Sequence, residues 1–251
     1  PMMSCAGRLP IYMMFVSALF PSRLQAPVLF GIYASGVLLA LCCARLLKNT
    51  LFKAPQRDSL HHMKRLRLPS LRKVGILMWS RAFMYVRKAG TFILGASIIL
   101  WFLNTYPRPE ENTAPTNAAA MEHSYAGQIG HWMEPVTQVA GFDWKINSAL
   151  VGAFAAKEIF VTQMGILYAV EDGNSVPAAQ QTLNARLKAS YTPLQGISIM
   201  IFCLIALPCI GTVTVAKREA GTWWFALAQF GGLTLLGFAT ATLIYQAGLL
   251  L

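Results

Sequence analysis

The sequence predicts an all-α fold: a polytopic membrane helix bundle with Pro/Gly-broken helices and amphipathic interfacial helices. Hydrophobic residues make up 55% of the 251 residues and charged residues only 12%, whereas charged residues make up about 25% of an ordinary soluble domain. Apolar runs close to the roughly 20 residues that a membrane-spanning helix needs recur along the chain, and no strand-like alternation persists. The expected spans are residues 27–47, 89–106, 146–170, 194–215 and 223–251, with a shorter, incomplete apolar run at 9–20.

The formal net charge of +11 is unevenly distributed along the chain. Residues 45–73 hold nine Lys or Arg residues and a single acid, Asp58, whereas residues 107–122 hold one base and three acids. A basic cluster beside a span marks the cytoplasmic side of a membrane, so we expect residues 89–106 to run outward. The distribution favours a lipid bilayer over nucleic acid as partner. Binding of acidic lipid or RNA by the basic segment remains open as an added role.

Two segments have the pattern of helices that lie on a membrane surface. A helix that starts after Ser70 carries basic residues at about two-turn intervals and precedes the span expected at 89. Apolar residues between Tyr125 and Val136 recur at helical spacing, and Pro135 predicts a kink or an early end there. The intervening residues 104–117 are expected to form a loop, and residues 171–181 are polar and irregular.

Two short motifs near opposite ends of the chain place a cysteine among helix breakers. Cys-x-Gly occurs at Cys5 and again at Cys209, each time with a proline nearby. Corresponding Pro/Gly-interrupted segments point to a transporter site, because an unwound helix frees backbone carbonyls that must face protein or a hydrated path. Close packing of these cysteines at helix breaks is the alternative. The expected helix-break residues are Gly7, Pro10, Pro208 and Gly211.

Lys157 and Glu158 lie side by side in the middle of the apolar residues 146–170. A charge at the centre of a bilayer costs at least a few kcal/mol, so such a residue is a functional-site hypothesis. Adjacent residues on a helix point about 100° apart, and we expect Glu158 to face the path. Lys157 offers donors only and is expected to be structural rather than a ligand. Glu158 could instead pair with a buried base to hold the bundle. The predicted ion pathway comprises Cys5, Cys209, Glu158 and Lys157, and its predicted metal ligands are Cys5, Cys209 and Glu158.

The remaining cysteines, methionines and histidines are interpreted as non-functional. The five cysteines show no spacing typical of a zinc site or a disulfide framework, and cysteines inside apolar spans usually act as small hydrophobes. The histidines are expected to be solvated and to lack a carboxylate partner three or four residues away. These residues are Cys42, Cys43, Cys203, Met2, Met3, Met13, Met14, His61, His62, His123 and His131.

Several separated motifs resemble the membrane part of ferrous iron transport protein B (FeoB), with its paired Gate regions. The motifs lie at residues 1–5, 8–12, 68–72, 88–91, 141–144, 154–158 and 207–209, with Arg218-Glu219. The resemblance implies Fe2+ uptake by a multi-pass protein of the bacterial cytoplasmic membrane. Thiolates and carboxylates can both bind Fe(II), and a transport site must also release its ion.

The sequence also departs from the FeoB pattern. It contains no Gly-x-x-x-x-Gly-Lys-Ser/Thr phosphate loop and lacks the earliest spans, so we expect the tail of a longer protein or one product of a split gene. The resemblance assigns GTP, Mg2+ and GTPase activity to an N-terminal GTP-binding domain, so no enzymatic activity and no cofactor are expected in this chain. Other implied partners are small iron-transport accessory proteins and a second copy in a homo-oligomer.

The resemblance divides the chain into six segments. The expected segments are 1–47 (end of the first Gate region and the following span), 48–88 (basic cytoplasmic loop and interfacial helix), 89–106 (span), 107–141 (polar loop and amphipathic helix), 142–219 (second Gate region) and 220–251 (C-terminal span).

Two alternative functions remain open. Related Gate regions occur in nucleoside carriers, and inward-facing amides such as Asn147 and Gln163 would suit a nucleoside. A membrane enzyme with a cysteine nucleophile needs a base within hydrogen-bond reach of the thiol, and no histidine lies within an expected span.

Overall fold

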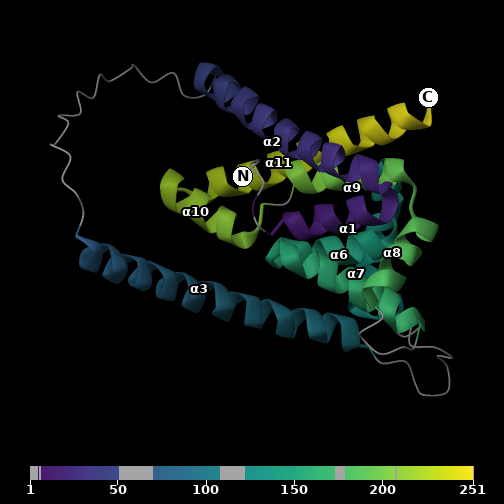
Figure 1. Ribbon diagram of the computed structural model, residues 1–251, viewed down its shortest axis with the longest axis horizontal. Helices are drawn as coiled ribbons and strands as arrows, with labels where there is room; N and C mark the ends of the chain where they lie inside the picture. The colour runs from purple at the N-terminus through teal and green to yellow at the C-terminus, as the bar shows by residue number, and fades with distance from the viewer. Residues whose placement is uncertain are drawn as a thin grey trace.

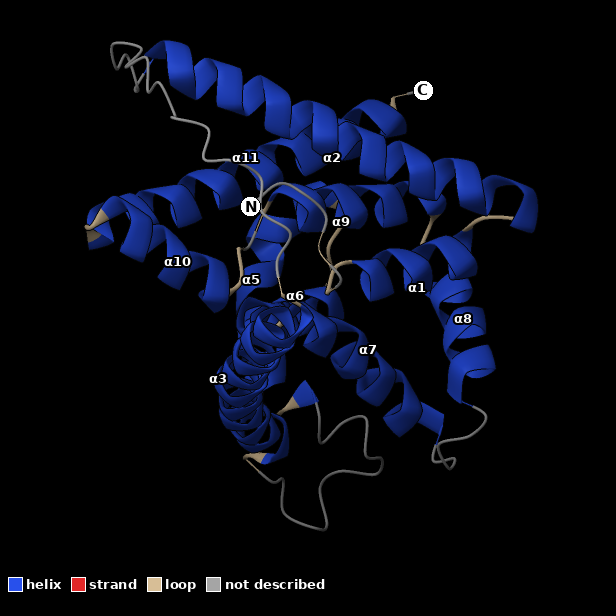
Figure 2. Cartoon of the chain, turned by 60° about the vertical axis from the view of Figure 1, so that its left-hand side comes forward, coloured by secondary structure: helices blue, strands red, loops and turns tan. Residues whose placement is uncertain are grey.

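The computed structural model describes residues 5, 7–50, 70–107, 122–172, 179–206 and 208–250. These residues form helices and connecting loops without any strand (Figures 1 and 2). The predicted all-α membrane bundle is therefore confirmed. The elements are α1 (Leu9–Leu19), α2 (Ser22–Thr50), α3 (Leu71–Thr105), α5 (Tyr125–Thr137), the 3-10 turn η1 (Gln138–Ala140), α6 (Trp144–Ala155), α7 (Lys157–Asp172), α8 (Ala179–Ser190), α9 (Pro193–Ile205), α10 (Ile210–Ala220) and α11 (Trp223–Leu249).

Three helical segments among the described residues are long and apolar enough to cross a membrane. They are Ser22–Leu46, Pro193–Ala220 and Trp223–Leu249, and the second includes the break between α9 and α10. The expected spans at 89–106 and 146–170 do not qualify. Leu94–Thr105 is a shorter apolar helix, and residues 146–170 are divided between α6 and α7.

The short apolar run at 9–20 forms the central helix of the bundle rather than a span. Helix α1 packs against α2, α7, α8 and α9, and Ile11, Tyr12 and Phe15 have no exposed surface. The Phe15 ring lies 6.1 Å from the ring of Phe160 and 6.4 Å from that of Tyr191. A buried apolar helix of 10–14 residues is typical of a protein core.

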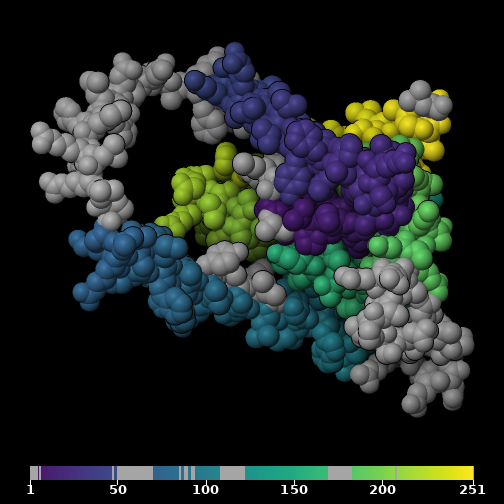
Figure 3. Space-filling model, in the orientation of Figure 1, coloured from purple at the N-terminus to yellow at the C-terminus, as the bar shows by residue number. Residues whose placement is uncertain are grey.

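Helix α3 runs without interruption through residue 89, so no change in the backbone marks the predicted boundary between an interfacial helix and a span. That boundary stays a prediction. Residues 88–91 include no proline, and the Thr91 hydroxyl donates to the Arg87 carbonyl at 2.7 Å within the helix. Among the described elements, α5 and α6 are the ones that make substantial contacts with α3. Its N-terminal half lies along one edge of the molecule, shown in blue in Figures 1 and 3.

Helix α5 packs through its small residues and not through its apolar stripe. Its buried face includes Gly130, where an added Cβ would collide with the Trp144 carbonyl of α6. Trp132, in contrast, is 82% exposed, as an interfacial helix with a lipid-facing stripe requires. The helix continues past Pro135 and ends at Thr137, so the predicted early end lies only two residues beyond the proline.

A half-buried carboxylate fixes the start of α6. Asp143 is the N-cap and accepts a hydrogen bond from the Ile146 amide at 2.9 Å and one from the Tyr191 hydroxyl at 2.8 Å. Burial raises the pKa of Asp143, although both hydrogen bonds oppose the shift. This pair ties the loop before α9 to the start of α6.

Candidate functional site

Breaks in three helical paths place the predicted site residues near helix ends. Residues 146–170 are interrupted at Ala156, whose backbone is extended (φ −149°, ψ 133°), and α9 ends before Ala206 while α10 starts at Ile210. Helix α1 starts at Leu9, directly after the predicted break residue Gly7 and Arg8. The positive ends of the α1, α7 and α10 dipoles are therefore located at these breaks.

The break residues predicted from the sequence lie in different positions relative to the helices. Gly7 and Pro208 lie outside helices, whereas Pro10 lies in the first turn of α1 and Gly211 is the second residue of α10. Proline is favoured in the first turn because its missing N–H would have no helical partner there. Pro10 therefore starts a helix, and the break lies before it.

Lys157 holds the end of a neighbouring broken helix. Its Nζ donates to the Cys203 carbonyl at 2.9 Å and to the Ala206 carbonyl at 3.1 Å, and the residue is only 6% exposed. These carbonyls lie at the C-terminal end of α9, where helical partners are missing. The lysine thus satisfies carbonyl groups that the sequence predicts to be free, which supports its structural interpretation.

Glu158 takes no part in that interaction. It is exposed and lies in the first turn of α7, where the helix dipole stabilises a negative charge. A Cβ on Gly7 would lie 3.0 Å from Glu158 Oε1 and 3.2 Å from its carboxyl carbon, so the carboxylate sits against the backbone just before α1. Glu158 belongs to none of the ion pairs in the described part of the chain, which disfavours a purely bundle-holding pair.

The two predicted cysteine ligands are both accessible. Cys209 is the N-cap of α10, half-buried, with Sγ 3.4 Å from the Thr212 hydroxyl. Cys5 is exposed, and its carbonyl accepts from the Arg8 amide at 3.1 Å. Neither cysteine is in dry core packing, whereas Cys203 is buried within α9 as predicted.

The predicted ligands are not assembled into a metal centre. Within the described ranges, no three His, Cys, Asp or Glu side chains come close enough together to hold a metal ion. Cys5, Cys209 and Glu158 therefore do not form a ready-made triad in this conformation. That these side chains bind an ion one after another along a path stays a prediction.

Arg8 is a site residue that the sequence reasoning missed. It is the N-cap of α1, is only 2% exposed and lies near enough to Lys157 for their two positive charges to repel each other. Its position directly after the first Cys-x-Gly motif was the available signal, because a base next to a predicted helix break is unusual in an apolar setting.

The amides proposed for a nucleoside carrier already have partners in the protein. Gln163 exchanges two hydrogen bonds with Asn104, at 2.8 and 2.9 Å. Asn147 donates to the Gly130 carbonyl at 3.2 Å and to the Thr137 hydroxyl at 2.8 Å. These bonds join α3 to α7 and α5 to α6, so both amides act as links between helices.

The predicted absence of carboxylate partners for histidine is wrong at His131. Its Nδ1 lies 3.1 Å from Glu134, three residues later, and its Nε2 lies 3.4 Å from Glu122. The ring also stacks on Trp144 at 4.9 Å. The spacing of His131 and Glu134 is visible in the sequence. His61, His62, Met2 and Met3 lie outside the described residues.

Comparison with protein families agrees with this architecture. The family model Gate, described as "Nucleoside recognition", matches residues 86–223, which is more than half of the chain. The chain is therefore a Gate-type membrane protein. A second family model, "Ferrous iron transport protein B C terminus", matches residues 29–81. The Gate match begins in α3, well before the second Gate region expected at 142–219.

Curated relatives identify the particular family. The Fe(2+) transporter FeoB of Campylobacter jejuni is 36% identical over 230 residues, which is 91% of this chain and 37% of the relative. A protein of Porphyromonas gingivalis named as an Fe(2+) transport protein A/Fe(2+) transporter FeoB fusion is 34% identical over all of this chain and 34% of the relative. The FeoB of Staphylococcus aureus is 32% identical over 99% of this chain and 35% of the relative. The chain belongs to the ferrous iron transport protein B family.

The chain spans between about a third and two fifths of the length of these curated relatives. No solved structure matches the chain significantly.

Proposed function

We propose that this chain forms part of the membrane portion of a multi-pass Fe2+ transporter in the bacterial cytoplasmic membrane. The names of the relatives support Fe2+ as cargo, and the apolar helices support a location in a membrane. The observation that carries the proposal is the Glu158 carboxylate, which sits exposed at a helix break against the backbone of Gly7.

The chemistry of the breaks suits a transient ion site. A carboxylate and two accessible thiols, once deprotonated, are ligands that Fe(II) accepts, and they lie at helix ends whose dipoles favour negative charge. Because they do not form a closed cluster, each can contribute in turn. An ion held by few ligands at a time binds weakly enough to leave, as transport requires.

Fe2+ uptake by the full-length protein in cells tests the thiol. We expect Cys209→Ser to lower uptake roughly tenfold or more, the scale on which metal sites respond to the loss of a supporting group, at unchanged membrane abundance. The matched control is Cys42→Ser, because Cys42 is an exposed cysteine of α2. Uptake by Cys209→Ser at the rate of the control would remove Cys209 from the ion path.

The same uptake assay tests the Glu158 carboxylate in two ways: by removing its charge and by substituting Gly7, against which it lies. Glu158→Gln keeps the shape of the side chain and removes its charge, so we expect it to lower uptake. Gly7→Ala places a methyl group 3.0 Å from Oε1, so the flexible carboxylate must move and uptake should fall. The control is Gly165→Ala in α7, where an added Cβ meets nothing within 4 Å. Normal uptake by Glu158→Gln would assign the carboxylate to structure alone.

The partners implied by the family are part of the proposal. The fusion relative of Porphyromonas gingivalis carries a transport protein A and a FeoB transporter in one polypeptide, which supports a small accessory protein as partner. We also assign GTP, Mg2+ and their binding domain to the full-length protein, and a homo-oligomer stays a prediction. Fe2+ uptake into proteoliposomes that does not depend on GTP and Mg2+ would contradict the coupling.

A further inference from the structure

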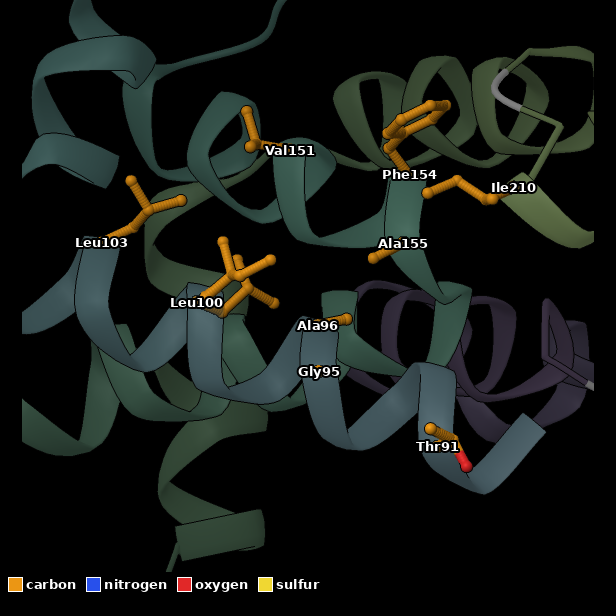
Figure 4. Close-up of a pocket in the computed structure, with 10 residues that line it drawn as sticks. Thr91, Gly95, Ala96, Leu100, Leu103, Val151, Phe154, Ala155 and Ile210 are labelled. Atoms are coloured by element: carbon orange, nitrogen blue, oxygen red, sulfur yellow. The ribbon is translucent and has the colours of Figure 1, made fainter. Parts of the chain in front are cut away.

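An apolar groove runs between α3 and α6 and ends at the start of α10 (Figure 4). Its volume is about 560 Å³. Gly95, Ala96 and Leu100 of α3 form one wall, Val151 and Phe154 of α6 form the other, and Ile210 closes one end. The groove belongs neither to the thiols nor to the carboxylate of the proposed ion path.

The lining offers almost no polar group to a ligand. Its polar side chain is Thr91, and the Thr91 hydroxyl donates to the Arg87 carbonyl of its own helix at 2.7 Å. From Thr91 to Leu103 the groove follows twelve residues of α3, which is about 18 Å of helix. Half of the hydrocarbon core of a bilayer is about 15 Å, so the groove has the length of one lipid acyl chain.

Positive charge lies one helical turn before one end of this groove, at Arg87, and continues along α3 away from the groove. Helix α3 carries Arg72, Lys73, Arg81 and Arg87 before Thr91, all of them exposed, and no acid in the same stretch. Basic residues next to an apolar surface at the cytoplasmic face attract anionic lipid headgroups. The charge therefore favours an anionic lipid over a neutral one.

We propose that this groove binds one acyl chain of an anionic phospholipid, whose headgroup lies at the Arg87 end. The site goes beyond the transport function, because it uses none of the residues of the proposed ion path. It also adjoins two helix breaks. Ala155 lines the groove immediately before the break at Ala156, and Ile210 follows Cys209. A bound acyl chain thus packs against the residues next to both helix breaks.

Native mass spectrometry of the full-length protein in detergent tests the site, with phosphatidylglycerol as the probe and phosphatidylcholine as the neutral comparison. Gly95→Phe puts a ring into the groove at a position where an added Cβ meets nothing within 4 Å. The control is Gly90→Phe, an equally open position on the same helix outside the lining. We expect Gly95→Phe to weaken retention of phosphatidylglycerol at least about tenfold, because a tenfold change corresponds to roughly two methylenes removed from apolar contact. Gly90→Phe should retain it like the unaltered protein.

Two further results decide the proposal. Arg87→Gln should reduce the preference for phosphatidylglycerol over phosphatidylcholine. A photo-crosslinking phenylalanine at position 95 should capture lipid. Equal retention of phosphatidylglycerol by Gly95→Phe and Gly90→Phe, equal retention of the two lipids by the unaltered protein, or crosslinks to another protein segment or a second copy would each overturn the proposal.

Discussion

Replacing Lys157 by methionine removes both hydrogen bonds to the C-terminal end of α9 while keeping the length of the side chain. The Cys203 and Ala206 carbonyls then lose the ammonium that lies 2.9 and 3.1 Å away. Because Lys157 is buried, water cannot replace it without a rearrangement. We therefore expect Lys157→Met to destabilise the protein and reduce its abundance in the membrane.

The size of the effect follows from the two carbonyls. A buried polar group left without a partner costs about 1–3 kcal/mol, whereas hydrogen bonds between membrane helices average only about 0.6 kcal/mol. Methionine also avoids the free-energy cost of burying an ammonium group, which offsets part of this loss. These considerations give a net loss of about 2–4 kcal/mol, a large share of the roughly 5–15 kcal/mol that stabilises a typical domain.

Thermal unfolding of the full-length protein in a mild detergent provides the measurement. Lys188→Met is the matched control, since Lys188 is an exposed lysine near the end of α8, and exposed substitutions usually change stability by less than about 0.5 kcal/mol. Glu158→Gln should unfold like the control although it lowers Fe2+ uptake. If Lys157→Met also unfolded like the control, the lysine would not hold the end of α9.

Two further predictions concern packing and pH. In Gly237→Ala the new Cβ would lie 2.6 Å from Ala206 Cβ and 3.0 Å from its backbone nitrogen, so unfolding measurements should show a loss of about 1–3 kcal/mol; Gly231→Ala, with open space at the same atom, should show no loss. Burial raises the pKa of Asp143 above its ordinary value of 3.8. Between that ordinary value and the raised pKa, the folded state binds more protons than the unfolded chain, so stability falls as the pH rises through this range. Tyr191→Phe removes a hydrogen bond that opposes the shift, so its stability should fall further, by about 1 kcal/mol at neutral pH; a pH profile parallel to that of the unaltered protein would contradict this assignment.

Composition was sufficient to predict the fold class and a C-terminal helix long and apolar enough to cross a membrane. Residues 223–251 were expected to span, and α11 runs from Trp223 to Leu249. Near Cys209, α9 ends at Ile205 and α10 starts at Ile210, where proline removes a backbone donor and its ring disfavours a continuous helix. These features depend on local chemistry, which the sequence shows directly.

The break at Ala156 could not be predicted in the same way. Residues 154–157 contain neither proline nor glycine, so local propensity favours a continuous helix. The chain leaves the helix where the next residue, Lys157, reaches carbonyls about 46 and 49 positions later. A tertiary contact of that kind leaves no periodic signal. Likewise, the charge pattern predicts a boundary in α3 near residue 89, whereas the helix itself runs through that position without a break.

The contact of Lys157 with α9 limits how a gate built from these helices can open. A movement that pulled α7 away from α9 would leave two peptide oxygens facing hydrocarbon, a medium that offers them no donor. The N-terminal end of α7 and the C-terminal end of α9 should consequently move together as a rigid unit, and the hinge must lie elsewhere. Distances measured by spectroscopic labels on these two ends should remain constant while those to α10 change.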